Sequence, residues 1–230
     1  LDGIEMSVFV LTDGEKYVIL PNAKDYKRIG ENDTGLNTGG MGCISPVPFA
    51  DNIFLSKVEN QIIKPTINGL NKDSIKYRGF IFFGLIKVNN NPFVIEYNIR
   101  MGDPETEVVM PRLKSDLLQL FKASINKTLD QIDVEFEKKN VATIILASGG
   151  YPLSYEKGKK ITGLNNINKS LVFHAGTKET NFIETNGGRV LACTGFGENI
   201  NEALKNSYKT ANKISWKNKY FRNDIGKDLI

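Results

Sequence analysis

The chain has 230 residues, of which 40% are hydrophobic and 24% are charged, as expected of a soluble globular protein with a real core. The net charge of +4 suits a partner that carries phosphates, but Lys and Arg are spread along the chain, so nucleic acid is not indicated. The two cysteines stand alone, which argues against a disulfide framework or a zinc site, and no apolar run is long enough to cross a bilayer. We expect a protein of the reducing cytoplasm, with no nucleic-acid partner and no membrane partner.

The N-terminal stretch LDGIEMSVFVL begins with a turn and leads straight into a strand pattern, without an initiator Met. We therefore expect the chain to be part of a longer polypeptide. Strand patterns over 4–12 and 16–21 flank Asp13-Gly14, which is a strong hairpin signal.

Further elements follow in chain order. We expect a helix over 51–70 capped by Asp51, a hairpin of strands 79–88 and 93–99, a capped helix from Ser115, strands over 141–147, 171–175 and 189–195, and a helix over 200–214. After the polar stretch 127–140, short strand patterns alternate with turns of Gly, Pro and Asn, so we place a domain boundary there. The fold class is α+β, with domains over 1–130 and 131–230.

The segment VIEYNIR, residues 94–100, carries polar groups on a strand. Because side chains alternate along a strand, Glu96, Asn98 and Arg100 point one way. The residues between them look like an ordinary core face: Ile95, Tyr97 and Ile99. Glu96 and Asn98 offer the hard oxygen ligands that magnesium prefers. The guanidinium of Arg100 can donate two parallel hydrogen bonds to phosphate or carboxylate oxygens. A solvated strand face is the alternative interpretation.

The segment MGDPE, residues 101–105, predicts a sharp strand-to-helix turn. Pro104 suits the first helical position and Asp103 suits the N-cap. Backbone amides at that helix start would then form an anion site beside Arg100. Simple capping is the alternative.

The loop DTGLNTGGMG, residues 33–42, has four glycines in ten residues. Glycines let successive N–H groups converge on a phosphate or carboxylate. The spacing fits no standard phosphate loop, and a flexible loop is the alternative. Lys27 and Arg28 lie just upstream and would supply positive charge.

Assembled, these stretches resemble one known family. The similarity follows the family order from end to end, through LDGIEMS, DYKR, DTGLNTGGMG, GFIFFGL, VIEYNIRMGDPET, PRLKSDL, ASGGYP, VFHAGT, TNGGRVL and FRNDIG. The chain resembles the phosphoribosylamine–glycine ligases, also called glycinamide ribonucleotide synthetases, which are of the ATP-grasp type. The resemblance implies that ATP activates glycine as an acyl phosphate, which the amine of 5-phosphoribosylamine attacks, in de novo purine biosynthesis.

The resemblance also implies residue roles. Glu96 and Asn98 would hold Mg²⁺ (or Mn²⁺) on the ATP phosphates, and Arg100 would stabilise charge on the transferring group. Lys27 would meet an ATP phosphate as a second catalytic residue, and Glu5 would lie near the nucleotide ribose. The pocket for glycine and phosphoribosylamine would be lined by Asn37, Thr38, Gly39, Gly40, Arg100 and Asp103.

For the fold, the resemblance implies a partial large ATP-grasp lobe over 1–130, an antiparallel sheet with helices, and a small β-rich C-terminal domain over 131–230. The N-terminal half of the same enzyme would precede Leu1, so we expect the chain alone to be nearly inactive. The strand GFIFFGL lacks the carboxylate that many ATP-grasp enzymes place there, which leaves a second metal position open. The alternatives are another ATP-grasp carboxylate–amine ligase and a non-catalytic anion-binding fragment.

Overall fold

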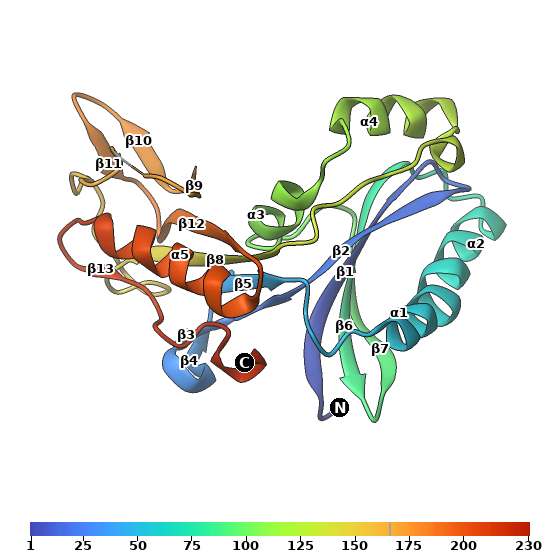
Figure 1. Ribbon diagram of the computed structural model, residues 1–230, viewed down its shortest axis with the longest axis horizontal. Coiled ribbons are helices and arrows are strands. Elements are labelled where there is room, and N and C mark those ends of the chain that lie inside the picture. The colour runs from blue at the N-terminus through green and yellow to red at the C-terminus, as the bar shows by residue number, and fades with distance from the viewer. Residues whose placement is uncertain (166) are drawn as a thin grey trace. The chain divides into compact units, whose positions relative to one another are not determined.

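The computed structural model describes residues 1–165 and 167–230, and the chain folds into two compact units (Figure 1). Unit 1 consists of Leu1–Lys24, Pro46–Gly102 and Val109–Glu137. Unit 2 consists of Asp25–Ser45, Asp103–Val108 and Lys138–Ile230. Each unit is therefore assembled from three stretches of chain, and the division into functional domains at 1–130 and 131–230 stays a prediction.

Unit 1 is built on an antiparallel sheet with the strand order β7-β6-β1-β2. The strands are β1 (Ile4–Thr12), β2 (Tyr17–Asp25), β6 (Gly79–Val88) and β7 (Asn91–Asn98). Both predicted hairpins are confirmed. Asp13-Gly14 joins β1 to β2, and Asn89 and Asn90 join β6 to β7 with φ of 48° and 60°, a left-handed conformation that asparagine adopts more readily than most residues.

One long helix covers a first face of this sheet (Figure 1). It runs through α1 (Asn52–Val58), a π-helical turn (Glu59–Ile63) and α2 (Lys64–Lys72), as predicted for 51–70. Asp51 is the expected cap, because its Oδ1 accepts a hydrogen bond from Phe54 N at 2.7 Å. The core on this face is formed by Met6, Val8, Val10, Val47, Phe54, Val58, Ile62, Ile63, Ile67, Ile81, Phe83 and Leu85.

The second face is covered by α4 (Leu117–Asn126), which buries Leu120 and Ala123 against Leu11 of β1. The prediction of a helix from Ser115 is correct in position, but the cap is Asp116. Its Oδ1 accepts from the amides at the start of α4, whereas Ser115 Oγ accepts from the distant Glu135 N. A carboxylate one residue closer to the helix therefore takes the capping role.

Unit 2 contains an antiparallel sheet ordered β5-β8-β12-β9, and β13 also pairs with β8. The strands are β5 (Gly42–Ser45), β8 (Asn140–Ser148), β9 (Ser170–His174), β12 (Arg189–Gly197) and β13 (Lys219–Tyr220). Helix α5 (Ile200–Lys213) packs on β8 and β12. The strands predicted over 141–147, 171–175 and 189–195 and the helix predicted over 200–214 are confirmed.

Close packing of α5 depends on glycine. A Cβ at Gly195 would lie 2.5 Å from Ser207 N, and one at Gly197 would lie 2.3 Å from Ala203 N. Only residues without a side chain allow the helix backbone to approach β12 this closely.

Two small hairpins complete unit 2: β3 (Arg28–Gly30) with β4 (Thr34–Asn37), and β10 (Thr177–Glu179) with β11 (Ile183–Thr185). The shortest α-helix is α3 (Thr106–Val109), and single 3-10 turns occur at Glu31–Asp33, Met110–Arg112, Leu129–Gln131 and Lys227–Leu229. Within the described residues, each helix is too short or too polar to span a bilayer.

Candidate functional site

The register of the unit 1 sheet brings Glu96 to the same face as Glu5. Glu96 of β7 pairs with Gly84 of β6, and Gly84 pairs with Ser7 of β1. Directly paired residues share a face, and Ser7 shares its face with Glu5 two positions away. Asn98 lies on this face too, two positions from Glu96. The sequence could not show this, because β6 separates β1 from β7.

Gly84 provides the space that Glu96 occupies. A Cβ at position 84 would lie 2.8 Å from Cγ of Glu96, closer than side-chain atoms pack. Any side chain there, including a second carboxylate, would displace Glu96.

Arg100 lies at the end of the same row, where Nη1 donates to Met101 O at 2.9 Å. Nη2 reaches Asn98 Oδ1 only at 3.5 Å, the limit of a hydrogen bond. Glu96 and Arg100 are exposed and Asn98 is half-buried, so these side chains are accessible to a ligand.

The donor set on this face suits a hard divalent cation. Mg²⁺ prefers oxygen ligands and usually keeps several waters or takes ligands from a substrate phosphate. The carboxylate of Glu96 and the amide oxygen of Asn98 match that pattern. In the part of the chain that the structure describes, there is no group of three or more Asp, Glu, His or Cys residues that could enclose a metal alone.

The predicted core face between these residues is wrong for Ile95 and Ile99, which are 47% and 72% exposed. Tyr97 is also 51% exposed, although its ring packs on Phe83 with centroids 5.4 Å apart. There are two reasons. In the described sheet β7 is an edge strand of unit 1, and a register shift opposite Gly84 and Leu85 interrupts its alternation at Ile95.

In unit 2 the amides of residues 38–41 of the glycine-rich loop are bonded within the protein. Thr38 N donates to Lys27 O at 2.8 Å, and Met41 N donates to Tyr26 O at 2.8 Å. Gly39 N donates to the Tyr151 hydroxyl and Gly40 N to Thr38 Oγ1. Every amide from 38 to 41 is therefore already bonded within the unit, and convergence of these N–H groups on an anion is not seen.

Close packing explains the glycines better. A Cβ at Gly39 would lie 2.7 Å from Cζ of Arg189. Gly40 has φ +112°, and a Cβ there would lie 2.3 Å from Cδ of Pro104 and 2.5 Å from Oδ1 of Asp25. The loop is thus built to lie against other segments of unit 2 and is not an open flexible loop.

The predicted helix start at 101–105 is also wrong in detail. The Asp103–Pro104 peptide is cis, and α3 begins only at Thr106 and has four residues. Asp103 therefore does not cap a helix. Instead, its Oδ1 forms an ion pair with Arg189 Nη1 at 2.9 Å. An anion site at a helix start beside Arg100 is not formed.

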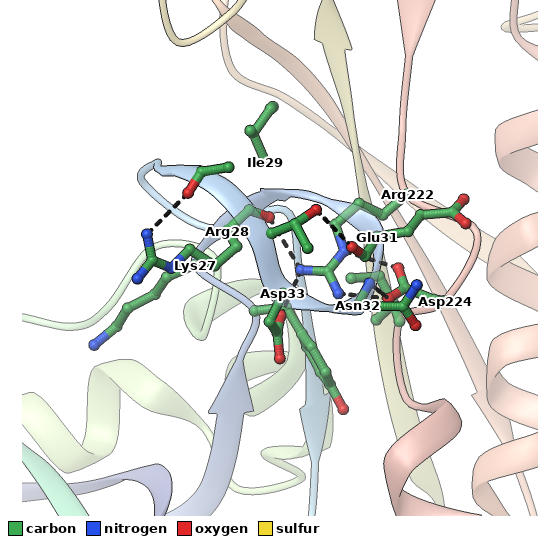
Figure 2. A network of polar contacts seen from close by, with 12 residues as sticks. Lys27, Arg28, Ile29, Glu31, Asn32, Asp33, Arg222 and Asp224 are labelled. Atoms are coloured by element: carbon green, nitrogen blue, oxygen red, sulfur yellow. Dashed lines mark hydrogen bonds and ion pairs between the residues drawn. The ribbon is translucent and has the colours of Figure 1, made fainter.

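A second arginine that the sequence analysis missed organises the β3–β4 hairpin (Figure 2). Arg222 is 1% exposed, and its guanidinium contacts Asp33 and Asp224 at 2.7 Å and the carbonyl oxygen of Arg28 at 3.0 Å. A buried guanidinium needs such partners. The signal in the sequence was FRND, an arginine two residues before an aspartate at the C-terminal end.

Lys27, at the base of this hairpin, is exposed and extends away from the Arg222 network in Figure 2. Arg28 beside it is also exposed and donates from Nη1 to Gly35 O at 2.8 Å. The structure therefore leaves both cationic heads at the surface of unit 2.

Two buried carboxylates of unit 2, Asp25 and Glu107, have raised pKa values. Burial and the neighbouring Glu105 raise the pKa of Asp25 well above its usual range, while the charges of Lys27 and Arg189 oppose this. Burial, followed by the charge of Asp103, raises the pKa of Glu107 to about 7. Asp25 Oδ1 and Glu107 Oε2 are buried and have no hydrogen-bond partner among the described residues, which fits groups that tend to hold a proton.

Comparison with known proteins decides the family. Residues 1–106 match the ATP-grasp (A) domain of phosphoribosylglycinamide synthetase, and residues 141–228 match its C domain. The chain belongs to the phosphoribosylglycinamide synthetase family. The predicted family and the α+β fold with an ATP-grasp sheet are confirmed.

Relatives in this family include the phosphoribosylamine–glycine ligases of Fusobacterium nucleatum, 42% identical over 98% of this chain, and Chlorobaculum tepidum, 44% identical over 98%. Each match covers 54% of the relative, so the chain spans about half the length of these curated relatives. A crystal structure of phosphoribosylamine–glycine ligase from Thermotoga maritima superposes with a TM-score of 0.84 at 37% identity, covering 97% of this chain and 56% of that one. An L-amino acid ligase from Bacillus licheniformis, at 16% identity and a TM-score of 0.60, shares the fold alone; the match covers 94% of this chain and 52% of that one.

Proposed function

We propose that the chain is part of an ATP-dependent ligase that joins glycine to 5-phosphoribosylamine in de novo purine biosynthesis. The γ-phosphoryl group of ATP passes to the glycine carboxylate, giving glycyl phosphate and ADP. The amine of phosphoribosylamine then attacks the acyl carbon and expels phosphate. Residues 1–130 supply a partial ATP-grasp lobe and 131–230 a C-terminal domain. The rest of the nucleotide site comes from a preceding half of the same enzyme.

In unit 1 the proposed ATP-binding residues are those on one sheet face. Glu96 and Asn98 hold Mg²⁺ or Mn²⁺, which neutralises charge on the ATP phosphates. Glu5 lies near the nucleotide ribose. The Arg100 guanidinium stabilises charge on the transferring phosphoryl group or the acyl phosphate.

In unit 2 we propose that Lys27 meets an ATP phosphate and that the glycine-rich loop contacts glycine and phosphoribosylamine. Asn37 and Gly39 are exposed, so this part of the loop is accessible to a ligand. The proposed substrate residues of unit 2 are Asn37, Thr38, Gly39, Gly40 and Asp103. In unit 1 the proposed substrate residue is Arg100.

The observation that carries the proposal is the shared face of Glu5, Glu96 and Asn98, combined with the family match at both ends of the chain. A solvated strand face needs no glycine beneath Glu96. The space kept free at Gly84 for this one carboxylate favours a functional row.

Phosphate release by the full-length polypeptide tests the proposal, measured with ATP, glycine and phosphoribosylamine and with each omitted in turn. We expect release only when all three are present. Release that depends on a different carboxylate or amine would indicate another ATP-grasp ligase. The absence of any ATP-dependent release would indicate a non-catalytic anion-binding protein.

A further inference from the structure

Arg189, the first residue of β12, contacts two segments far away in the sequence. Its Nη1 donates to Gly39 O at 2.6 Å and to Asp103 O at 3.2 Å, across 150 and 86 residues respectively. The same nitrogen pairs with Asp103 Oδ1 at 2.9 Å. One guanidinium thus links the glycine-rich loop to the turn that follows Gly102. Arg189, the loop and Asp103 all lie in unit 2.

The loop is held from its other side by Tyr151. Gly39 N donates to the Tyr151 hydroxyl at 3.1 Å, while Gly39 O accepts from Arg189. Tyr151 is itself seated on glycine, because a Cβ at Gly188 would lie 2.2 Å from its Cδ2. Both backbone polar groups of Gly39 are therefore fixed by side chains from residues 138–230.

The glycine at 39 is required by this contact. Its φ is not in the left-handed region, so its backbone conformation does not demand glycine, but a Cβ would lie 2.7 Å from Arg189 Cζ. The absence of a side chain at 39 leaves the space that the guanidinium occupies. Arg189 is 20% exposed and stands at a strand end, so apolar packing does not account for it.

We infer that Arg189 is a positioning residue, with Tyr151 as its partner, through which the C-terminal domain fixes the substrate loop and Asp103 before glycine or phosphoribosylamine binds. The inference rests on the proposed function, because that function assigns substrate contacts to the loop. An arginine suits the task because the planar guanidinium holds the two N–H bonds of Nη1 in fixed directions toward both segments, whereas lysine offers a point charge on a flexible stem. Without it, the loop would have to be ordered by the substrate itself.

The test compares Arg189→Lys and Tyr151→Phe with the wild type in the full-length polypeptide. We expect the KM for glycine or phosphoribosylamine to rise about tenfold or more for Arg189→Lys, as for loss of a charge-assisted hydrogen bond, and by less for Tyr151→Phe. The KM for ATP should stay within about twofold. Arg78→Lys is the matched control, because Arg78 donates to Ile125 O in unit 1 and touches neither segment.

Hydrogen exchange of residues 33–42 gives a readout that does not depend on activity. We expect faster exchange of the loop amides in both variants, with no change in β1 and β6. Unchanged loop exchange, or a parallel rise in all three KM values, would overturn the inference. If the wild type lacks the ligase reaction, the proposed function fails, and exchange alone then decides whether Arg189 holds the loop.

Discussion

At the scale of single residues, the strand register decides which face of the sheet each β7 side chain lies on and how exposed it is. Glu96 stands over a glycine and shares a face with Glu5, while Ile95 beside it falls at a register shift and is exposed. Register follows from the strand order, and the residue's place in the sequence alone does not reveal it. Three residue-scale predictions follow from the site.

Glu96→Gln in the full-length polypeptide should lower metal-dependent turnover by tenfold or more, equivalent to about 1.4 kcal/mol of barrier. The change is nearly isosteric, so it removes charge without disturbing the space over Gly84. Turnover titrated with Mg²⁺ and the melting temperature are the measurements. Activity within twofold of the wild type would show that Glu96 is not a ligand.

Arg100→Lys should reduce turnover by about 10²-fold, roughly 2.7 kcal/mol, while ATP affinity changes little. Lysine keeps the charge but loses the fork that can bind two phosphate oxygens. Steady-state kinetics and direct ATP binding separate the two effects. Weaker ATP binding with normal turnover would instead make Arg100 a ground-state anchor.

Glu107→Gln should change how stability depends on pH. The pKa of Glu107 is raised from 4.5 to about 7, mainly by burial, so its contribution is fully present below pH 4.5 and is lost as pH rises through 7. The groups facing it are Asp103 and Glu105, which raise the pKa, and Arg189, which lowers it.

The wild-type melting temperature should therefore fall between pH 5 and pH 8, by a few degrees, since 1 kcal/mol corresponds to about 2–4 °C for a chain of this size. Glu107→Gln should flatten that slope but not remove it, because the pKa of Asp25 is raised as well. Glu179→Gln, at an exposed position of β10, is the matched control. An identical slope in Glu107→Gln and wild type would contradict the assignment.

At the scale of elements, local patterns predicted most helices and strands. Asp13-Gly14, Asp51 and the periodicity of 200–214 each act through neighbours in the sequence, and the structure confirms them. The start of α3 was not predictable in this way. Asp103 had the right position for a cap, but a distant arginine takes its carboxylate.

The same limit applied to the candidate site. Residue types and spacing indicated the polar row on β7, but the contribution of Arg189 and Arg222 depends on contacts between segments some 85 to 195 residues apart. A single sequence carries no record of such contacts. The glycines of 33–42 stood out because of their number; the structure shows that Gly39 and Gly40 pack closely against other segments of unit 2, and their contact with substrates stays a prediction.

The packing around two glycines predicts opposite effects of alanine substitution on the free energy of unfolding. Gly195→Ala should destabilise the protein by about 1–3 kcal/mol, because the new Cβ would meet Ser207 N at 2.5 Å and push α5 from β12. Gly69→Ala in α2 has open space around it and should stabilise by about 0.5–1 kcal/mol. Urea unfolding of the two variants measures both. A neutral Gly195→Ala would show that α5 can shift without cost.

At the scale of the whole molecule, the chain spans about half the length of the curated relatives it matches. We expect turnover by the 230-residue chain alone to be at least about 10²-fold below that of the full-length polypeptide, because positioning is the main source of rate in phosphoryl transfer. The same phosphate-release measurement on both proteins tests this. Comparable turnover would mean that this chain carries a complete site.

The assembly of unit 2 from three separate stretches has a consequence for biosynthesis. Strand β5 ends at Ser45, but its partner β8 begins only at Asn140. A ribosome adds about 5–20 residues per second, so β5 would wait roughly 5–20 s for its partner to be made, while the hairpins of unit 1 can pair at once. During that interval the edge of β5 that pairs with β8 has no partner, so this part of the unit 2 sheet can form only after residues 140–148 have been made.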